Sequence, residues 1–213
     1  ALLFVVASRT MTASILYIHG LNSSPASLKA SQLSRAMAHL GLENQLRVPA
    51  LHHHPRQAIT QLQALISELG APLLVGSSLG GYYATYLAEQ HGLKALLINP
   101  AVKPHLRFDG YLGPQKNYYS DETWDLTADH VHALAELEVA PPLDASRYQV
   151  WLQTGDETLD YRDAERYYRA CALRIQAGGD HGFQGFTEHL PALFAFAGIS
   201  ATLWRDTDFS AFN

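Results

Sequence analysis

Short apolar runs alternate along the chain with segments in which apolar residues recur every three or four positions. A short run is typical of a strand buried in a sheet, whereas the wider spacing is typical of a helix with one buried face. Ser24 and Pro25 have the residue types of an N-cap and a first-turn proline, so the first helix should begin there. Predicted strands cover residues 15–18, 46–48, 71–75, 95–98, 148–152 and 173–176, and predicted helices cover residues 25–40, 59–69, 81–89, 160–170 and 186–196. This alternation predicts an α/β fold, with a mostly parallel central sheet of about six strands and helices on both faces.

The stretch 101–148 interrupts the alternation. It contains several prolines and tyrosines, and within it only residues 129–137 have a helical pattern. A long insertion between two strands of such a sheet commonly forms a lid over a binding site. We therefore expect a single domain over residues 11–213, with a short lid-like insertion at 101–148.

Composition narrows the classes of partner. Hydrophobic residues make up 47% of the 213 residues and charged residues 16%, enough for one sizeable core. The net charge is −5 and lysine and arginine form no block, so nucleic acid and anionic membranes are not expected as main partners. No apolar run approaches the roughly 18 residues of a membrane-spanning helix. Cys171 is the single cysteine, which excludes an internal disulfide and a cysteine-based zinc cage.

The N-terminal segment resembles a signal peptide only in part. Residues 1–7 include the apolar run Leu-Leu-Phe-Val-Val, but the run is short and no basic residue precedes it. Because Met11 follows closely, we expect residues 1–10 to be an upstream extension.

A G-x-S-x-G pattern lies between a predicted strand and a predicted helix. The segment is Gly76-Ser77-Ser78-Leu79-Gly80, and only Ser78 has glycine at both the minus-two and plus-two positions. In this context the pattern predicts a nucleophile elbow, a tight turn that presents a serine hydroxyl above the sheet. The flanking glycines fit because the backbone of such a turn is strained and packs closely. The alternative is a turn of small residues with a solvated serine.

A serine nucleophile needs a base and an acid, which follow it in the order serine, acid, histidine in the α/β-hydrolase fold. Asp156 follows one predicted strand and His181 follows the last one, so both should reach the end of the sheet where Ser78 lies. Asp156 could instead cap the next helix, and Glu157 and Asp160 are rival acids. His181 is one of eleven histidines, so a surface role is its alternative.

Acyl transfer also needs donors for the oxyanion that develops on the substrate. The backbone N–H of Leu79, directly after the serine, is one predicted donor. The loop after the first strand should supply the second, with Leu21 as the first candidate and Asn22 as the runner-up. His19 in the same loop is expected to shape the turn through side-chain hydrogen bonds rather than to act as a base.

The run His52-His53-His54 invites a metal interpretation. Adjacent histidines point in different directions and no acidic cluster accompanies them, so we predict no metal site there. The proposed chemistry requires no cofactor.

Taken together, these motifs resemble those of the YqiA-like esterases, a family of small bacterial α/β hydrolases. The resemblance covers residues 14–198 approximately. It rests on Leu16-Tyr17-Ile18-His19-Gly20-Leu21-Asn22-Ser23-Ser24-Pro25, Val75-Gly76-Ser77-Ser78-Leu79-Gly80-Gly81-Tyr82-Tyr83-Ala84-Thr85, Asn99-Pro100-Ala101-Val102, Gln153-Thr154-Gly155-Asp156-Glu157 with Leu159-Asp160-Tyr161-Arg162, and Gly178-Gly179-Asp180-His181. The chain departs from the family in residues 1–10 and in His52-His53-His54, which replaces a proline-rich loop.

The resemblance implies Ser78 as nucleophile, Asp156 as acid and His181 as base. It further implies hydrolysis of acyl esters, with acyl-CoA thioesters as a further candidate, in the bacterial cytoplasm. The hypothesis from the sequence is therefore a serine esterase or thioesterase with a small-molecule substrate. One alternative is the same triad acting on a C–C or amide bond, and another is a non-catalytic binding module on the hydrolase fold.

Overall fold

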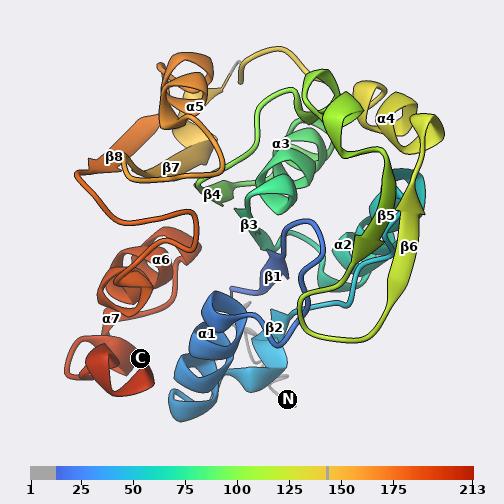
Figure 1. The fold of residues 1–213 in the computed structure, drawn as a ribbon. Coiled ribbons are helices and arrows are strands. Elements are labelled where there is room, and N and C mark those ends of the chain that lie inside the picture. The colour runs from blue at the N-terminus through green and yellow to red at the C-terminus, as the bar shows by residue number, and fades with distance from the viewer. Residues whose placement is uncertain (1–12, 143) are drawn as a thin grey trace, which may run out of the picture.

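Six parallel strands form the central sheet of the computed structural model, which describes residues 13–142 and 144–213 (Figure 1). The strand order is β2-β1-β3-β4-β7-β8, and every neighbouring pair is parallel. The strands are β1 (Ile15–Ile18), β2 (Leu46–Arg47), β3 (Leu73–Ser77), β4 (Ala95–Ile98), β7 (Tyr148–Gln153) and β8 (Ala172–Gln176). The predicted fold class and the six predicted strands are confirmed. The expectation for residues 1–10 lies outside the described residues.

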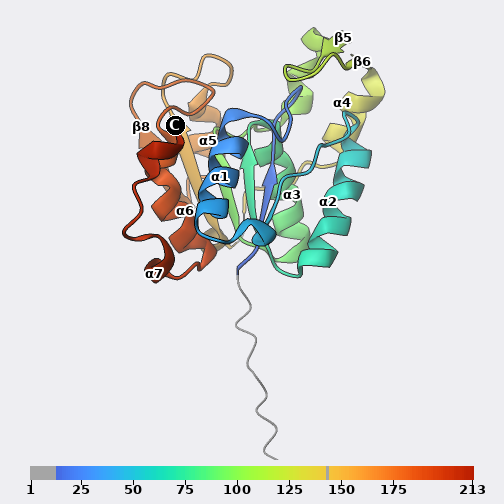
Figure 2. The same ribbon diagram turned by 90° about the horizontal axis from the view of Figure 1, so that it is seen from below.

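Alternate side chains of each central strand enter two separate cores. In β1, Leu16 and Ile18 join one core while Ile15 and Tyr17 join the other. The main helices that cover the first face are α2 (Pro55–Leu69), α3 (Leu79–His91) and α5 (Tyr161–Tyr167), and those that cover the second are α1 (Leu28–His39) and α6 (Leu190–Ala197) (Figure 2). Because helices cover both faces, the strands are apolar at successive positions, which is why they appear as continuous runs.

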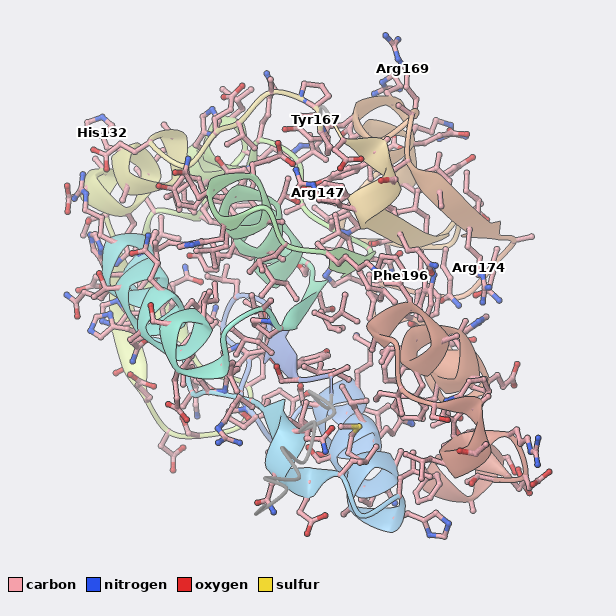
Figure 3. The ribbon with its side chains drawn as sticks, turned by 180° about the vertical axis from the view of Figure 1, so that it is seen from behind. His132, Arg147, Tyr167, Arg169, Arg174 and Phe196 are labelled. Carbon is pink, nitrogen blue, oxygen red and sulfur yellow. The ribbon has the colours of Figure 1, made fainter. Side chains whose placement is uncertain are left out.

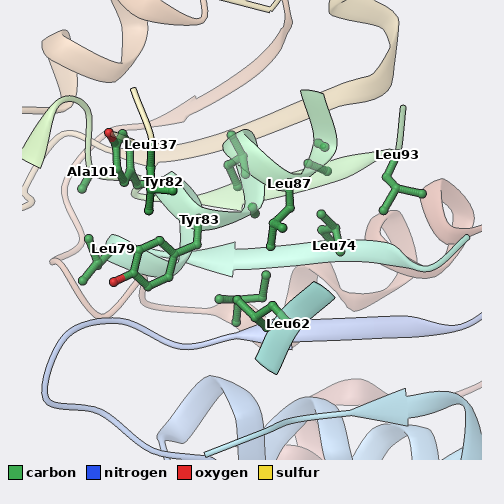
Figure 4. Packing of buried hydrophobic residues seen from close by; sticks show 14 of the residues in the cluster. Leu62, Leu74, Leu79, Tyr82, Tyr83, Leu87, Leu93, Ala101 and Leu137 are labelled. Carbon is green, nitrogen blue, oxygen red and sulfur yellow. The ribbon is translucent and has the colours of Figure 1, made fainter. Parts of the chain in front are cut away.

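The core around α3 fixes the helix that follows Ser78. Leu87 of α3, Leu62 of α2 and Leu74 of β3 are fully buried and belong to the same cluster (Figure 4). Burying a leucine side chain contributes about 1.5–3 kcal/mol, so this packing strongly favours one position of α3 on the sheet. At the far end of α3, the Arg147 guanidinium donates to the carbonyl oxygens of Ala88 (2.8 Å) and Leu93 (3.0 Å) (Figure 3). Such bonds satisfy carbonyl groups at a helix C-terminus.

Two helix predictions need correction. The first helix begins at Leu28 with Ser27 as N-cap, and not at Pro25. Ser24 instead forms a turn, because its hydroxyl accepts from the Ala26 N–H (3.0 Å) and its carbonyl accepts from the Ser27 N–H (3.1 Å). The predicted helix 186–196 is divided into a 3₁₀ segment, Phe186–His189, followed by α6.

The insertion between β4 and β7 contains structure that the sequence pattern did not indicate. Two 3₁₀ segments, Pro104–Leu106 and Phe108–Tyr111, precede an antiparallel hairpin of β5 (Gly113–Lys116) and β6 (Thr123–Leu126). The helix expected at 129–137 is present as α4 (Ala128–Ala135). The hairpin and α4 lie beyond one end of the central sheet, on the side of α2 (Figures 1 and 2).

After α6 the chain packs back onto the second core. A short helix, α7 (Ala201–Trp204), precedes the 3₁₀ segment Phe209–Phe212. Phe209 is buried, with its ring centroid 5.6 Å from that of Phe194. In the described part of the chain, no helix is both long enough and apolar enough to span a bilayer.

Candidate active site

Ser78 stands on a strained turn between β3 and α3. Its backbone has φ 55° and ψ −122°, in the positive-φ region that side chains rarely adopt. Glycine is required around it because a Cβ on Gly80 would lie 2.6 Å from the His19 carbonyl oxygen, and one on Gly81 would lie 2.6 Å from the Pro100 side chain. The local geometry is that of a nucleophile elbow, with the serine hydroxyl presented at the strand end.

A hydrogen-bonded chain joins the three residues that the sequence singled out. The Ser78 Oγ lies 3.0 Å from Nε2 of His181. Nδ1 of the same imidazole lies 2.8 Å from Oδ2 and 3.0 Å from Oδ1 of Asp156. The Asp156 side chain is 2% exposed and that of His181 is 23% exposed, so the carboxylate is shielded while the imidazole faces solvent. This is the geometry that activates a serine hydroxyl as a nucleophile.

The three neighbouring acids have distinct positions. Asp156 also accepts from the backbone N–H groups of Thr158 (2.9 Å) and Leu159 (2.8 Å), which hold its carboxylate toward His181. Glu157 accepts from the backbone N–H of His181 (3.0 Å) and so holds the loop rather than the ring. Asp160 caps α5 by accepting from the Arg162 N–H (3.0 Å), the role considered for Asp156.

Two buried amides hold the His181 loop, and neither was among the predicted site residues. Asn99, at the end of β4, donates to the carbonyl oxygens of Asp180 (3.1 Å) and His181 (3.3 Å). Gln153, at the end of β7, accepts from the N–H groups of Asp180 (3.1 Å) and Gln184 (2.9 Å). Their places at strand ends were the available signal, but an amide at a strand end does not reveal which loop it will bind.

The loop after β1 packs directly against Ser78. A Cβ on Gly20 would lie 3.1 Å from the Ser78 Cβ, so only glycine fits without displacement. Leu21 and Leu79, the two predicted oxyanion donors, both border the cavity beside Ser78. Among the hydrogen bonds of the described residues, neither backbone N–H has a protein acceptor. Both therefore remain able to bind a substrate oxygen.

His19 is engaged on both ring nitrogens. Its Nε2 accepts from the Leu51 N–H (3.3 Å), which leaves Nδ1 as the donor to the Gly20 carbonyl oxygen (3.0 Å). Burial lowers the pKa of His19, which favours the same neutral form. His19 therefore shapes the turn, as expected, and does not reach Ser78 as a base.

Asn22 connects this loop to the β5–β6 hairpin. Its side-chain amide donates to Oε1 of Gln115 (3.0 Å) and accepts from Nε1 of Trp124 (2.9 Å). Its carbonyl oxygen accepts from the Tyr118 N–H (2.8 Å), and its φ is 53°. The runner-up for the oxyanion donor thus uses its side chain to join the hairpin to the loop that contains Leu21.

A cavity of about 710 Å³ opens beside Ser78 and His181. Part of its wall is the loop after β1 with the first turn of α1, and another part comes from the insertion, including Phe108, Tyr111, Tyr118 and Tyr119. A cavity of this size with mostly apolar walls accommodates a small organic molecule.

The three consecutive histidines pack under the hairpin. The His53 ring stacks on Trp124, with centroids 4.8 Å apart and an interplanar angle of 16°. His53 Nδ1 lies 3.1 Å from Nε2 of His130 in α4, and His54 Nε2 lies 2.8 Å from Oδ2 of Asp129. Among the described residues, no group of three or more potential ligands is arranged to hold a metal ion. The cluster has a packing role beneath β6.

This cluster should make stability depend on pH. Burial first, and then the nearby His54 and His53, lower the pKa of His130 from 6.5 to about 4. An unfolded chain therefore binds more protons than the folded chain between these values, so stability falls as the pH drops through this window. For His130 alone we expect a loss of about 2 kcal/mol between pH 7.5 and pH 5, measured by urea unfolding.

A matched pair of variants isolates that effect. His130→Gln should remove this part of the pH dependence, so its unfolding free energies at pH 7.5 and pH 5 should differ by about 2 kcal/mol less than those of the wild type. His132 lies exposed on the outer side of the same helix (Figure 3), and His132→Gln should keep the wild-type dependence. Equal pH dependence in all three proteins would contradict the role given to His130.

Comparisons with known proteins concern the family and the fold of the chain. Residues 14–198 match the model of the family described as "Uncharacterised protein family (UPF0227)". A UPF0227 protein of Shewanella woodyi is 29% identical over 192 residues, which cover 85% of this chain and 98% of that protein. Among solved structures, mouse alpha/beta hydrolase domain-containing protein 10 is similar with a TM-score of 0.65 and 13% identity, covering 85% of this chain and 88% of that one.

A monoacylglycerol lipase of Paleococcus ferrophilus is similar with a TM-score of 0.59 and 14% identity, covering 89% of this chain and 97% of that one. At these identities the likeness concerns the fold. The chain has the α/β-hydrolase fold, and the neighbours include a lipase.

Proposed function

The chain belongs to the UPF0227 family, and we propose that it is a serine hydrolase that cleaves carboxylic esters of acyl groups. Acyl-CoA thioesters are a second substrate class for the same chemistry. The observation that carries the proposal is the hydrogen-bonded chain from Ser78 through His181 to Asp156 at the mouth of a cavity.

The proposed reaction has two halves. Ser78 Oγ attacks the acyl carbonyl carbon while Nε2 of His181 takes the hydroxyl proton, and Asp156 stabilises the imidazolium. The backbone N–H groups of Leu21 and Leu79 bind the oxyanion of the tetrahedral intermediate. His181 then gives its proton to the leaving alcohol or thiol, which departs and leaves the acyl group on Ser78. Water, deprotonated by His181, hydrolyses this acyl-enzyme and restores the serine.

We further propose that the insertion at 101–148 acts as a lid. Its residues border the cavity, and the bonds of Asn22 join its hairpin to the loop of the proposed oxyanion donor. A substrate that moves the hairpin would therefore also move Leu21. Substrate binding and the position of the Leu21 N–H in the oxyanion site would then be coupled.

The two alternatives differ from the proposal in different ways. A binding module has no need for a serine held at φ 55°, and such strain persists at sites where it serves a function. An amidase or C–C hydrolase would use the same residues, so the distinction lies in the substrate.

Two measurements test the proposal together. The protein should hydrolyse p-nitrophenyl esters within a series of two to sixteen acyl carbons. The acyl chain length with the highest kcat/KM should indicate the length of chain that the cavity accepts. A fluorophosphonate probe should label Ser78, as located by peptide mass spectrometry. Labelling without turnover of any ester would favour an amide or C–C substrate, and the absence of both would favour the binding module.

A further inference from the structure

The first turn of α1 forms one end of the cavity and contributes a cation to it. Ser27, Leu28 and Lys29 all border the cavity. The Lys29 Nζ donates to the carbonyl oxygen of Gly182 at 2.7 Å. Within the described ranges, its ammonium makes no ion pair with a carboxylate, so its charge is not neutralised by contact.

The rest of the cavity wall contributes no carboxylate to pair with this charge; Asp180 and Asp156 act on it only from outside the wall. The chain contains 20 acidic and 15 basic residues, yet no aspartate or glutamate is among the described residues that border the cavity. Arg107, the other arginine or lysine on the wall, is ion-paired with Asp163. Lys29 is therefore the unpaired cation of this cavity.

Further unsatisfied donors lie beside Lys29. The Ser27 hydroxyl oxygen is buried and has no hydrogen-bond partner among the described residues. The first turn of α1 contains no acidic residue, and the Ser27 side chain does not cap the helix. A helix N-terminus offers free N–H groups and a partial positive charge, which favour an anion. The ammonium and the helix end thus present donors to one end of the cavity, and the neighbouring Ser27 hydroxyl is buried without a partner.

The lowered pKa of Lys29 agrees with a role in binding an anion. Burial lowers the pKa of Lys29 from 10.5 to about 8, and the more distant Asp180 and Asp156 oppose this shift only in part. A lysine that is desolvated without a paired carboxylate is stabilised when an anion binds it.

The position of Lys29 indicates which part of a substrate it meets. His181 must protonate the leaving atom of the substrate, so the leaving group lies on the His181 side of Ser78. Lys29 contacts Gly182, the residue next to His181, and therefore stands on that same side. The acyl chain of the substrate would then lie against the apolar residues of the insertion.

We propose that Lys29 and the first turn of α1, which follows the N-cap Ser27, form a subsite for a carboxylate or phosphate group on the leaving alcohol or thiol. This inference rests on the proposed function, whose substrate class it narrows to acyl esters with an anionic leaving group. The competing explanation is that the Lys29–Gly182 bond only positions the His181 loop. In that case the loss of Lys29 would affect neutral and anionic substrates equally.

Three aryl acetates separate these explanations. Methyl 3-acetoxybenzoate is neutral, 3-acetoxybenzoate carries a carboxylate on its leaving group, and 3-acetoxyphenyl phosphate carries a phosphate. For Lys29→Met we expect kcat/KM to fall about 10- to 100-fold on the anionic esters, the range for a lost hydrogen bond to a charged group, and less than threefold on the neutral ester. The anion with the larger loss identifies the preferred group.

Two further variants complete the test. Lys29→Arg keeps the charge and should retain most of the anion preference. Lys94→Met removes an exposed lysine before β4, at the opposite end of the sheet, and should leave the ratio of anionic to neutral turnover unchanged. An equal loss on all three esters in Lys29→Met, or no loss on any of them, would overturn the subsite while the neutral ester still reports the hydrolase.

A binding measurement makes the result independent of turnover. Ser78→Ala protein should bind 3-hydroxybenzoate by calorimetry, and adding Lys29→Met should weaken that binding at least tenfold. Unchanged binding would overturn the subsite. Failure of the proposed function has a different signature, namely no turnover of the neutral ester and no labelling of Ser78.

Discussion

Replacing Ser78 with alanine is expected to lower kcat for p-nitrophenyl ester hydrolysis by about 10⁴-fold or more. The substitution removes the Oγ that is proposed to form the acyl-enzyme and that lies 3.0 Å from His181 Nε2. Turnover that remains would come from substrate binding and the oxyanion donors alone. KM should change little because the cavity walls are unaltered, and steady-state kinetics on the preferred ester would measure both constants.

Two controls accompany this experiment: one removes the neighbouring hydroxyl of Ser77, and the other combines substitutions at Ser78 and His181, whose effects on kcat should not add. Ser77→Ala removes the hydroxyl one residue earlier, at the end of β3, and should keep kcat within tenfold. Ser78→Ala combined with His181→Ala should be no slower than Ser78→Ala alone, because the two side chains act as one unit. A Ser78→Ala protein with more than a tenth of wild-type activity would exclude Ser78 as the nucleophile.

The parallel sheet explains why so much of the site could be predicted from the sequence. Its strands are buried on both faces, so each one appears as a continuous apolar run whose end is easy to locate. Ligand sites in such sheets lie beyond the carboxyl ends of the strands, which limited the candidates to residues directly after each run. Ser78, Asp156 and His181 all follow strands, and the structure brings them within hydrogen-bond distance.

Contacts between loops could not be predicted in the same way. Asn99 and Gln153 bind the His181 loop across long sequence separations, and a single sequence contains no signal for such pairings. The β5–β6 hairpin was missed because Gly113–Lys116 contains glycine, proline, glutamine and lysine, which are not typical of a strand. The start of α1 was misplaced because Ser24-Pro25 can begin either a helix or a turn, and here it forms a turn before a helix that begins at Leu28.

The same close packing that positions Ser78 predicts the largest effect on stability, at Gly80. A Cβ on Gly80 would overlap the Ile18 carbonyl oxygen and would lie 2.6 Å from the His19 carbonyl oxygen. Both atoms are backbone atoms of the β1 end, so no side-chain rotation can relieve the overlap. For Gly80→Ala we expect the free energy of unfolding to fall by more than about 4 kcal/mol. That is a large part of the roughly 5–15 kcal/mol by which a typical domain is stable.

Gly110→Ala is the matched control, because a Cβ there would meet no atom within 4 Å and its φ is not positive. Its unfolding free energy should stay within about 0.5 kcal/mol of the wild type. Gly80→Ala should instead lower Tm by about 10 °C or more, or fail to accumulate as soluble protein. A folded Gly80→Ala protein with unchanged Tm would show that α3 can move away from β1. In that case the elbow would not depend on this contact, and the strain at Ser78 would need another source.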